Sequence, residues 1–90
     1  MNYKIIILKR ARKFIEKQTP EIQKRILQAI MKLPDGDIKS LRGHNGVFRL
    51  RINDFRIIYS LDNETITITV IDAGNRGQIY KNYWFLDVKL

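Results

Sequence analysis

The sequence predicts an α+β fold: an N-terminal strand, a helical hairpin, and then an antiparallel sheet of three to four strands. Three observations lead to this prediction. A short β-branched run opens the chain, two segments with helical apolar spacing follow it, and strand-forming runs separated by turn residues fill the second half. The 90 residues suit one small domain, which we place at 1–90 because no repeat, low-complexity tract or linker divides the chain.

The first strand is predicted at residues 3–8, where β-branched residues dominate. A helix should follow, because buried-type side chains recur there at helical spacing: Ala11, Phe14, Ile15 and Gln18. Most of the other positions in this segment are Lys or Arg. The first helix is therefore expected to have a basic outer face.

The second helix has a start signal and a stop signal. Thr19 is expected to cap it, and Pro20 and Glu21 suit its first turn. Its buried stripe is predicted to be Ile22, Ile26, Ala29, Ile30 and Leu33, and Pro34, Asp35 and Gly36 should end it. Because so short a link joins the two helices, they should form an antiparallel hairpin laid over the sheet.

The main sheet is expected to begin near Gly46, with a hairpin that turns at Asn53 and Asp54. A two-residue turn there pairs Phe48 with Tyr59, Arg49 with Ile58, Leu50 with Ile57, Arg51 with Arg56, and Ile52 with Phe55. Because side chains alternate along a strand, one face becomes entirely apolar and the other carries the three arginines with Ile58.

The next strand is expected to follow a turn at Asp62 and Asn63. The same counting places Ile66 beside Tyr59, Ile68 beside Ile57, Val70 beside Phe55, and Thr69 beside Arg56. Two glycines in GNRG then let the backbone bend and direct Arg76 at the sheet face, with Asp72 as its expected ion-pair partner. Residues 78–80 are predicted to form a closing edge strand.

Three arginines occupy strand positions of the predicted hairpin, and their presence there requires an explanation. Arg51 would face Arg56 at about 5 Å between Cβ atoms, a like-charge pair that costs a few tenths of a kcal/mol to about 1 kcal/mol. Guanidinium groups can grip a phosphate at two points each, so the face has the chemistry of an anion site. The alternative is an ordinary solvated face of an antiparallel sheet.

Charge supports an anionic partner. The chain carries 17 Lys and Arg against nine Asp and Glu, a net charge of +8. Nine of those cations, but only two of the acidic residues, lie within the first 33 residues. This surplus favours binding to a polyanion, although a solvated helix face would have the same composition.

Composition also narrows the class of protein. The chain has no Cys and one His, which excludes disulfides and thiolate metal sites and leaves little for zinc. The apolar run at residues 5–8 is too short for a signal peptide or a membrane span. We therefore expect a cytoplasmic protein with no membrane partner, no metal and no small-molecule cofactor.

The segment LRGHNGVFRLRINDFRIIYSLDNETITITVIDAGNRGQIY, preceded by a strand and a helical hairpin, resembles the RelE branch of the RelE/ParE toxin superfamily of bacterial and archaeal toxin–antitoxin systems. The likeness covers essentially the whole chain. It rests on a Leu-x-Gly segment, basic alternation in the next strand, an aromatic-Arg-x-x-Tyr strand, and a final Gly-x-Arg followed by Tyr. The resemblance implies a RelE-like fold of the microbial-ribonuclease type.

The same resemblance implies the toxin of a type II toxin–antitoxin system that inhibits translation. It would cleave mRNA in the ribosomal A site without a metal, by attack of a ribose 2′-hydroxyl on the adjacent phosphate. The catalytic positions fall on Arg51, Arg56, Arg76 and Tyr80, and one RNA-binding position falls on Arg49. Further RNA contacts are expected from other basic residues: Lys9, Arg10, Lys13 and Arg42. The implied partners are a RelB-like antitoxin, the ribosome and mRNA.

Some roles stay open from the sequence. Arginine is a poor general base, so the proton acceptor is not identified, and Tyr80 could stack on a base or assist proton transfer. His44 is read as a surface residue, and the aromatic residues 83–85 as a packed flap, an RNA-stacking platform or an antitoxin contact. The main alternative function is a ParE-like, non-enzymatic poison of DNA gyrase, and a plain RNA-binding module is a third.

Overall fold

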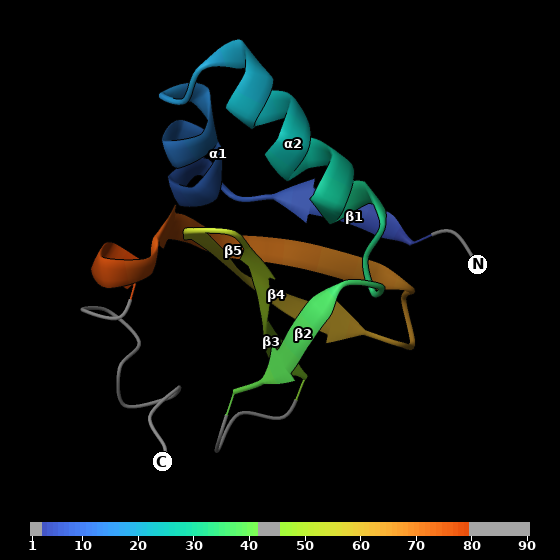
Figure 1. Ribbon diagram of the computed structural model, residues 1–90. Coiled ribbons are helices and arrows are strands. Elements are labelled where there is room, and N and C mark those ends of the chain that lie inside the picture. The colour runs from blue at the N-terminus through green and yellow to red at the C-terminus, as the bar shows by residue number, and fades with distance from the viewer. Residues whose placement is uncertain (1–2, 42–45, 80–90) are drawn as a thin grey trace.

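The computed structural model describes residues 3–41 and 46–79. Its elements are β1 (Lys4–Ile7), α1 (Lys9–Glu16), α2 (Pro20–Met31), β2 (Asp37–Ser40), β3 (Val47–Ile52), β4 (Phe55–Asp62) and β5 (Thr67–Asn75). The two helices lie together on one face of a single sheet, which gives a two-layer α+β arrangement (Figure 1). The predicted fold class is confirmed. No helix within the described residues is long and apolar enough to span a membrane.

The sheet has five strands in the order β1-β5-β4-β3-β2. Only the β1–β5 pair is parallel, so the sheet is mixed rather than purely antiparallel. The sequence prediction missed β2, and its statement that the sheet begins near Gly46 was wrong. The strand DIKS is four residues long and only Ile38 among them is apolar, so its alternation is too short to stand out.

The helices follow their predicted patterns. The Thr19 hydroxyl accepts a 3.3 Å hydrogen bond from the Ile22 N–H, and Pro20 occupies the first turn of α2. The inward residues of both helices join the main core, which consists of Ala11, Ile15, Ile26, Ile30, Leu33, Leu50, Ile52, Ile57, Tyr59, Ile68, Val70 and Ala73. This core fills the space between the helices and the sheet.

The β3–β4 hairpin has the predicted register. Asn53 and Asp54 form its two-residue turn, and Asn53 adopts φ +51°, as this kind of turn requires. Leu50 pairs with Ile57, and Arg51 pairs with Arg56. The two arginines therefore do face each other across the sheet, on the side opposite the helices.

The predicted register of β5 was wrong by four residues, because Val70 rather than Ile66 lies opposite Tyr59. The turn after β4 is longer than the two residues expected, since β4 and β5 end their pairing at Asp62 and Thr67. The Asp62 carboxylate accepts hydrogen bonds from the N–H groups of Thr65 and Glu64, and these bonds lower the pKa of Asp62.

A β-bulge in β5 shifts the pairing further. Ile58 pairs with Asp72 while Tyr59 pairs with Val70, so Ile71 is left as the extra residue. As a result Arg56 lies beside Gly74, not beside Thr69 as the sequence counting placed it.

The face opposite the helices is not uniformly solvated. Leu41, Ile58 and Ile79 form a second, small buried cluster there. Residues 76–79 have helical conformation, so the predicted edge strand at 78–80 was wrong for the part that the structure describes. A short helical turn lets Ile79 fold back beneath the sheet onto Ile58, which an extended strand leading away from β5 would not do.

Candidate functional site

Neighbouring strands bring a row of charged side chains together on the face opposite the helices. Asp37 on β2 pairs with Arg51 on β3, which pairs with Arg56 on β4. Because residues in register point to the same face, all three side chains lie on one side of the sheet. Arg76 follows directly after β5.

These residues line a polar cleft of about 410 Å³, which we call the arginine cleft; its lining residues are Asp37, Arg51, Asn53, Asp54, Arg56 and Arg76. The volume lies in the range of about 300–1,000 Å³ that is usual for small-ligand sites. Three guanidinium groups therefore line the cleft, which is large enough to hold one anionic group, such as a phosphate, and the atoms attached to it.

Arg56 is the anchored member of the cleft. The residue is only 6% exposed, and its Nη1 donates to the carbonyl oxygens of Asn53 at 2.8 Å and Phe55 at 3.1 Å. Its Nε has no hydrogen-bond partner among the described residues. The Nε atom is itself buried, so what Arg56 gives the cleft that it lines is a fixed positive charge at the wall.

Arg51 is held by a residue that sequence reasoning overlooked. Its Nε lies 2.6 Å from Oδ2 of Asp37, and the two side chains are 55% and 46% exposed. This contact places a negative charge beside the Arg51–Arg56 pair and offsets its repulsion. The sequence signal for it is weak, because the run DIKS that follows the turn at Pro34–Gly36 has only one apolar residue.

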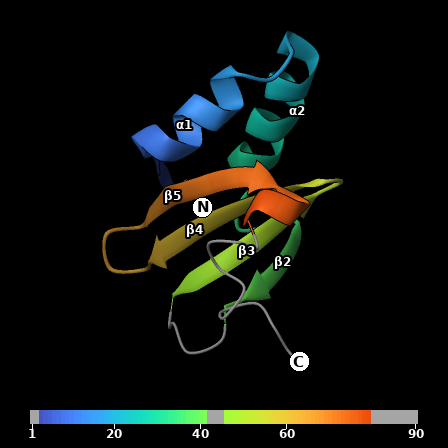
Figure 2. The ribbon, with the colours of Figure 1, turned by 90° about the vertical axis from the view of Figure 1, so that its left-hand side faces the viewer.

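Arg76 is positioned through its backbone. Its N–H donates a 2.7 Å hydrogen bond to the carbonyl oxygen of Asp54, which ties the exit of β5 to the β3–β4 turn, and Figure 2 shows these two segments on the same side of the molecule. The side chain is exposed and is therefore accessible to an external ligand.

The expected ion pair between Asp72 and Arg76 was wrong. The Asp72 carboxylate is 4% exposed, and its Oδ2 lies 3.6 Å from the Nε of Arg10. Its other oxygen accepts a 2.8 Å hydrogen bond from the Ala73 N–H. Because β1 ends beside Val70, the last part of β5 is an open edge that Arg10 can reach from the start of α1.

The other predicted site residues are not gathered in the cleft. Arg49 lies on the same face but pairs with Ile58, one step away from the Arg51–Arg56 pair. Lys9 and Lys13 lie on α1, in the helical layer. Arg42 and Tyr80 lie outside the described residues, as do His44 and the aromatic segment 83–85.

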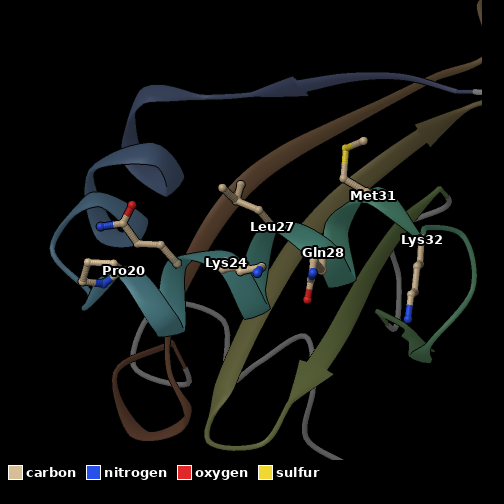
Figure 3. Close-up of a pocket in the computed structure, with 7 residues that line it drawn as sticks. Pro20, Lys24, Leu27, Gln28, Met31 and Lys32 are labelled. Atoms are coloured by element: carbon tan, nitrogen blue, oxygen red, sulfur yellow. The ribbon is translucent and has the colours of Figure 1, made fainter.

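A larger depression of about 760 Å³ lies on the outer side of α2, far from this chemistry in the fold; Pro20, Gln23, Lys24, Leu27, Gln28, Met31 and Lys32 line it (Figure 3). Leu27 is 40% exposed and Met31 is 73% exposed. We call this surface the α2 groove. Its apolar ridge between lysines suits contact with another macromolecule rather than catalysis.

The chain matches a known family of proteins over most of its length. The family model described as the ParE toxin of the type II toxin–antitoxin system parDE matches residues 5–80. The chain belongs to the RelE/ParE toxin superfamily. It is therefore a toxin of a type II toxin–antitoxin system.

Solved structures of superfamily members show the same fold. The toxin–antitoxin complex RelBE2 from Mycobacterium tuberculosis matches with 23% identity and a TM-score of 0.70, over 84% of this chain and 100% of that chain. The archaeal RelE–RelB complex from Pyrococcus horikoshii OT3 has the same identity and TM-score, over 87% and 99%. A mutant of the E. coli toxin RelE in the free state matches with 18% identity and a TM-score of 0.71, over 98% and 100%. No curated protein matched the chain. The fold is RelE-like, while the matching family model is named for ParE.

Proposed function

We propose that this toxin is a ribosome-dependent endoribonuclease that cleaves mRNA in the A site and so stops translation in the cytoplasm. The observation that supports this proposal is the arginine cleft, in which Arg51, Arg56 and Arg76 line one polar hollow. A toxin that acts only by binding and blocking its target does not need three guanidinium groups around a cleft of this size.

The chemistry follows from charge. When a ribose 2′-hydroxyl attacks the neighbouring phosphorus, negative charge grows on the non-bridging oxygens and on the leaving 5′-oxygen. Arg56, fixed by the Asn53 and Phe55 carbonyls, and Arg76 bind the non-bridging oxygens. Arg51, the third guanidinium of the cleft, binds the same phosphate. Groups already held in place stabilise this charge without reorganising during the reaction.

Further residues complete the proposed site. Arg49, beside the cleft on β3, orients the RNA backbone, with Lys9, Arg10, Lys13 and Arg42 as contacts to more distant phosphates. Tyr80 stacks on a base or assists proton transfer. The ribosome supplies the alignment of the attacking hydroxyl with the phosphate, which accounts for a requirement for ribosome-bound message.

The proposed protein partner is a RelB-like antitoxin that covers the α2 groove with an amphipathic, acidic helix. Leu27 and Met31 form an exposed apolar ridge, and Lys24 and Lys32 also line the groove, so the complementary ligand has apolar residues on one face and carboxylates beside them. Relatives of the same fold were crystallised with RelB antitoxins. The net charge of +8 favours such an acidic partner.

The second candidate function is that of a gyrase poison without nuclease activity, and the match to the family model named for ParE favours it. The two candidates differ in what is damaged. A nuclease leaves truncated mRNAs with ends inside reading frames, whereas a gyrase poison leaves the message intact and damages DNA topology.

The deciding experiment is brief induction of wild type, Arg76→Ala and Arg12→Ala, followed by mapping of mRNA 5′ ends and of plasmid supercoiling. Arg76→Ala keeps the backbone hydrogen bond to Asp54, so it removes a phosphate contact without disturbing the turn. We expect its cleavage to fall about 100-fold or more, while Arg12→Ala, an equal charge change on the exposed side of α1, keeps wild-type cleavage. Intact mRNA with altered supercoiling in the wild type would reject the nuclease and support the gyrase function.

A further inference from the structure

We propose that Asp37 is a further catalytic residue of the arginine cleft, whose carboxylate accepts the proton of the attacking 2′-hydroxyl. This inference rests on the proposed ribonuclease function. It identifies a group for the one role that the arginines cannot fill, because a guanidinium keeps its proton at any physiological pH.

Asp37 lies in register with Arg51 and, through it, with Arg56, and it lines the same cleft as Arg76. A phosphate held by the three guanidinium groups therefore lies next to this carboxylate. The side chain is 46% exposed, so the carboxylate is accessible to an incoming ribose.

The contact with Arg51 fixes the carboxylate. The 2.6 Å contact joins one oxygen of Asp37, Oδ2, to the Nε of Arg51. Among the described residues Arg51 is the only polar partner of this side chain, which leaves Oδ1 available to accept a hydrogen bond from substrate. The same contact uses only the Nε of Arg51, so the terminal nitrogens of that guanidinium stay available for a phosphate.

Asp54 is the competing acid in the cleft. It occupies the β3–β4 turn, its side chain is exposed, and within residues 3–41 and 46–79 no hydrogen bond or ion pair orients its carboxylate. A general base must be held within hydrogen-bond reach of the proton it takes. Asp37 is oriented by Arg51 and Asp54 is not, so the geometry favours Asp37.

The proposed step moves one proton and replaces one bond to phosphorus by another. The 2′-O–H bond breaks and its proton moves to Oδ1 of Asp37, while the 2′-oxygen forms a bond to phosphorus. The bond from phosphorus to the 5′-oxygen breaks, the 5′-oxygen takes a proton from water, and the other fragment ends in a 2′,3′-cyclic phosphate. Asp37 then returns its proton to solvent, and no metal, oxidant or other reactant is consumed.

The test compares Asp37→Asn, Asp37→Ala and Asp54→Asn in single-turnover cleavage on ribosomes programmed with a defined message. The Asn variant at position 37 keeps an oxygen that can accept from the Nε of Arg51, but it cannot take a proton. We expect both changes at Asp37 to slow cleavage about 100-fold or more, and Asp54→Asn to slow it much less. Binding to ribosomes carrying a 2′-deoxy, uncleavable message should change less than about threefold in Asp37→Asn.

The contrast between the two changes at Asp37 separates a general base from a positioning role. Full activity in Asp37→Asn with a loss only in Asp37→Ala would mean that Asp37 merely positions Arg51, and would overturn the inference. A larger loss in Asp54→Asn than in Asp37→Asn would overturn it too. In both cases wild-type cleavage would leave the proposed function intact, whereas a wild type that never cleaves message would reject the function and the inference together.

Discussion

At the scale of single residues, Arg56 and Arg76 contribute differently to stability although both line the arginine cleft. Arg56 is buried and donates to two carbonyl oxygens in and beside the turn, whereas the Arg76 side chain is exposed. Arg56→Ala should therefore lower the free energy of unfolding by about 1–3 kcal/mol as well as abolish cleavage, because it removes a buried side chain and its two partly buried hydrogen bonds. Arg76→Ala should leave the free energy of unfolding, measured with denaturant, within about 0.5 kcal/mol of wild type. Equal stabilities of the two variants would contradict this division.

Tyr59 makes the fold sensitive to alkaline pH. Burial raises the pKa of Tyr59 to about 12, from an ordinary value near 10. The folded state thus holds the phenolic proton more tightly than the unfolded chain does. Its contribution is fully present below about pH 10 and is lost as the pH rises toward 12, a change of about 2 kcal/mol.

The measurement is the free energy of unfolding from about pH 8 to about pH 12 in wild type and in Tyr59→Phe. The Phe ring keeps the stacking on Phe48, whose centroid lies 5.4 Å from that of Tyr59, but it has no proton to lose. The wild type should therefore lose about 2 kcal/mol more than the variant over this range. Parallel declines in the two proteins would show that other groups control the alkaline transition.

At the scale of elements, the β3–β4 hairpin was predictable because Asn53 and Asp54 leave room for only one two-residue turn, and any slip would move arginines into the core. The β5 register was not predictable by the same counting. Its turn has four unpaired residues, with Ile66 at φ +51°, and its bulge at Ile71 has no sequence signal as strong as a turn dipeptide. The longer loop and the bulge together therefore changed the pairing partner of every β5 residue.

The candidate site was predictable to the same extent as the hairpin. The Arg51–Arg56 pair followed directly from the turn, and Arg76, which the resemblance singled out, lines the same cleft. Asp37 was missed because its strand is short, and the Asp72 partner was wrong because Arg10 arrives from a helix distant in sequence. Removing Arg51 would relieve its repulsion with Arg56, but it would also break the ion pair between Arg51 and Asp37. The Arg51–Arg56 pair therefore costs less stability than the sequence alone indicates.

The α2 helix supports a prediction about the antitoxin. Met31→Glu should weaken binding of the cognate antitoxin about tenfold or more, because it removes an apolar contact from the interface and places a like charge beside an acidic helix. Cleavage by the free toxin should be unchanged, since Met31 is remote from the arginine cleft. Titration calorimetry measures the affinity, with Asn63→Glu as the control because it places the same charge in the 63–66 loop. Equally weakened binding in the two variants would mean that net charge, not the α2 groove, controls the interaction.

At the scale of the whole molecule, the charge of +8 should control RNA affinity more than any single residue does. Binding of a short single-stranded RNA should weaken steeply between about 50 and about 200 mM salt. Changing Lys9 and Lys13 together to Gln should reduce the slope of log K against log salt by up to about 1.4, or about 0.7 for each phosphate that is no longer neutralised. Fluorescence anisotropy over a series of salt concentrations measures both slopes. An unchanged slope would show that the basic face of α1 does not bind RNA.

The parallel pairing of β1 with β5 has a consequence for how the toxin is made. Lys4 to Ile7 are synthesised before the other strands of the sheet, yet their pairing partners are residues 67–70, which are synthesised last among the paired strands. The helices that follow β1 likewise wait for the sheet on which they pack. Contacts so distant in sequence form slowly, because a long loop must close before they are made. The fold and the arginine cleft therefore become complete together, after Arg76 has been added, and no shorter nascent chain has the assembled cleft with which to attack the ribosome that is making it.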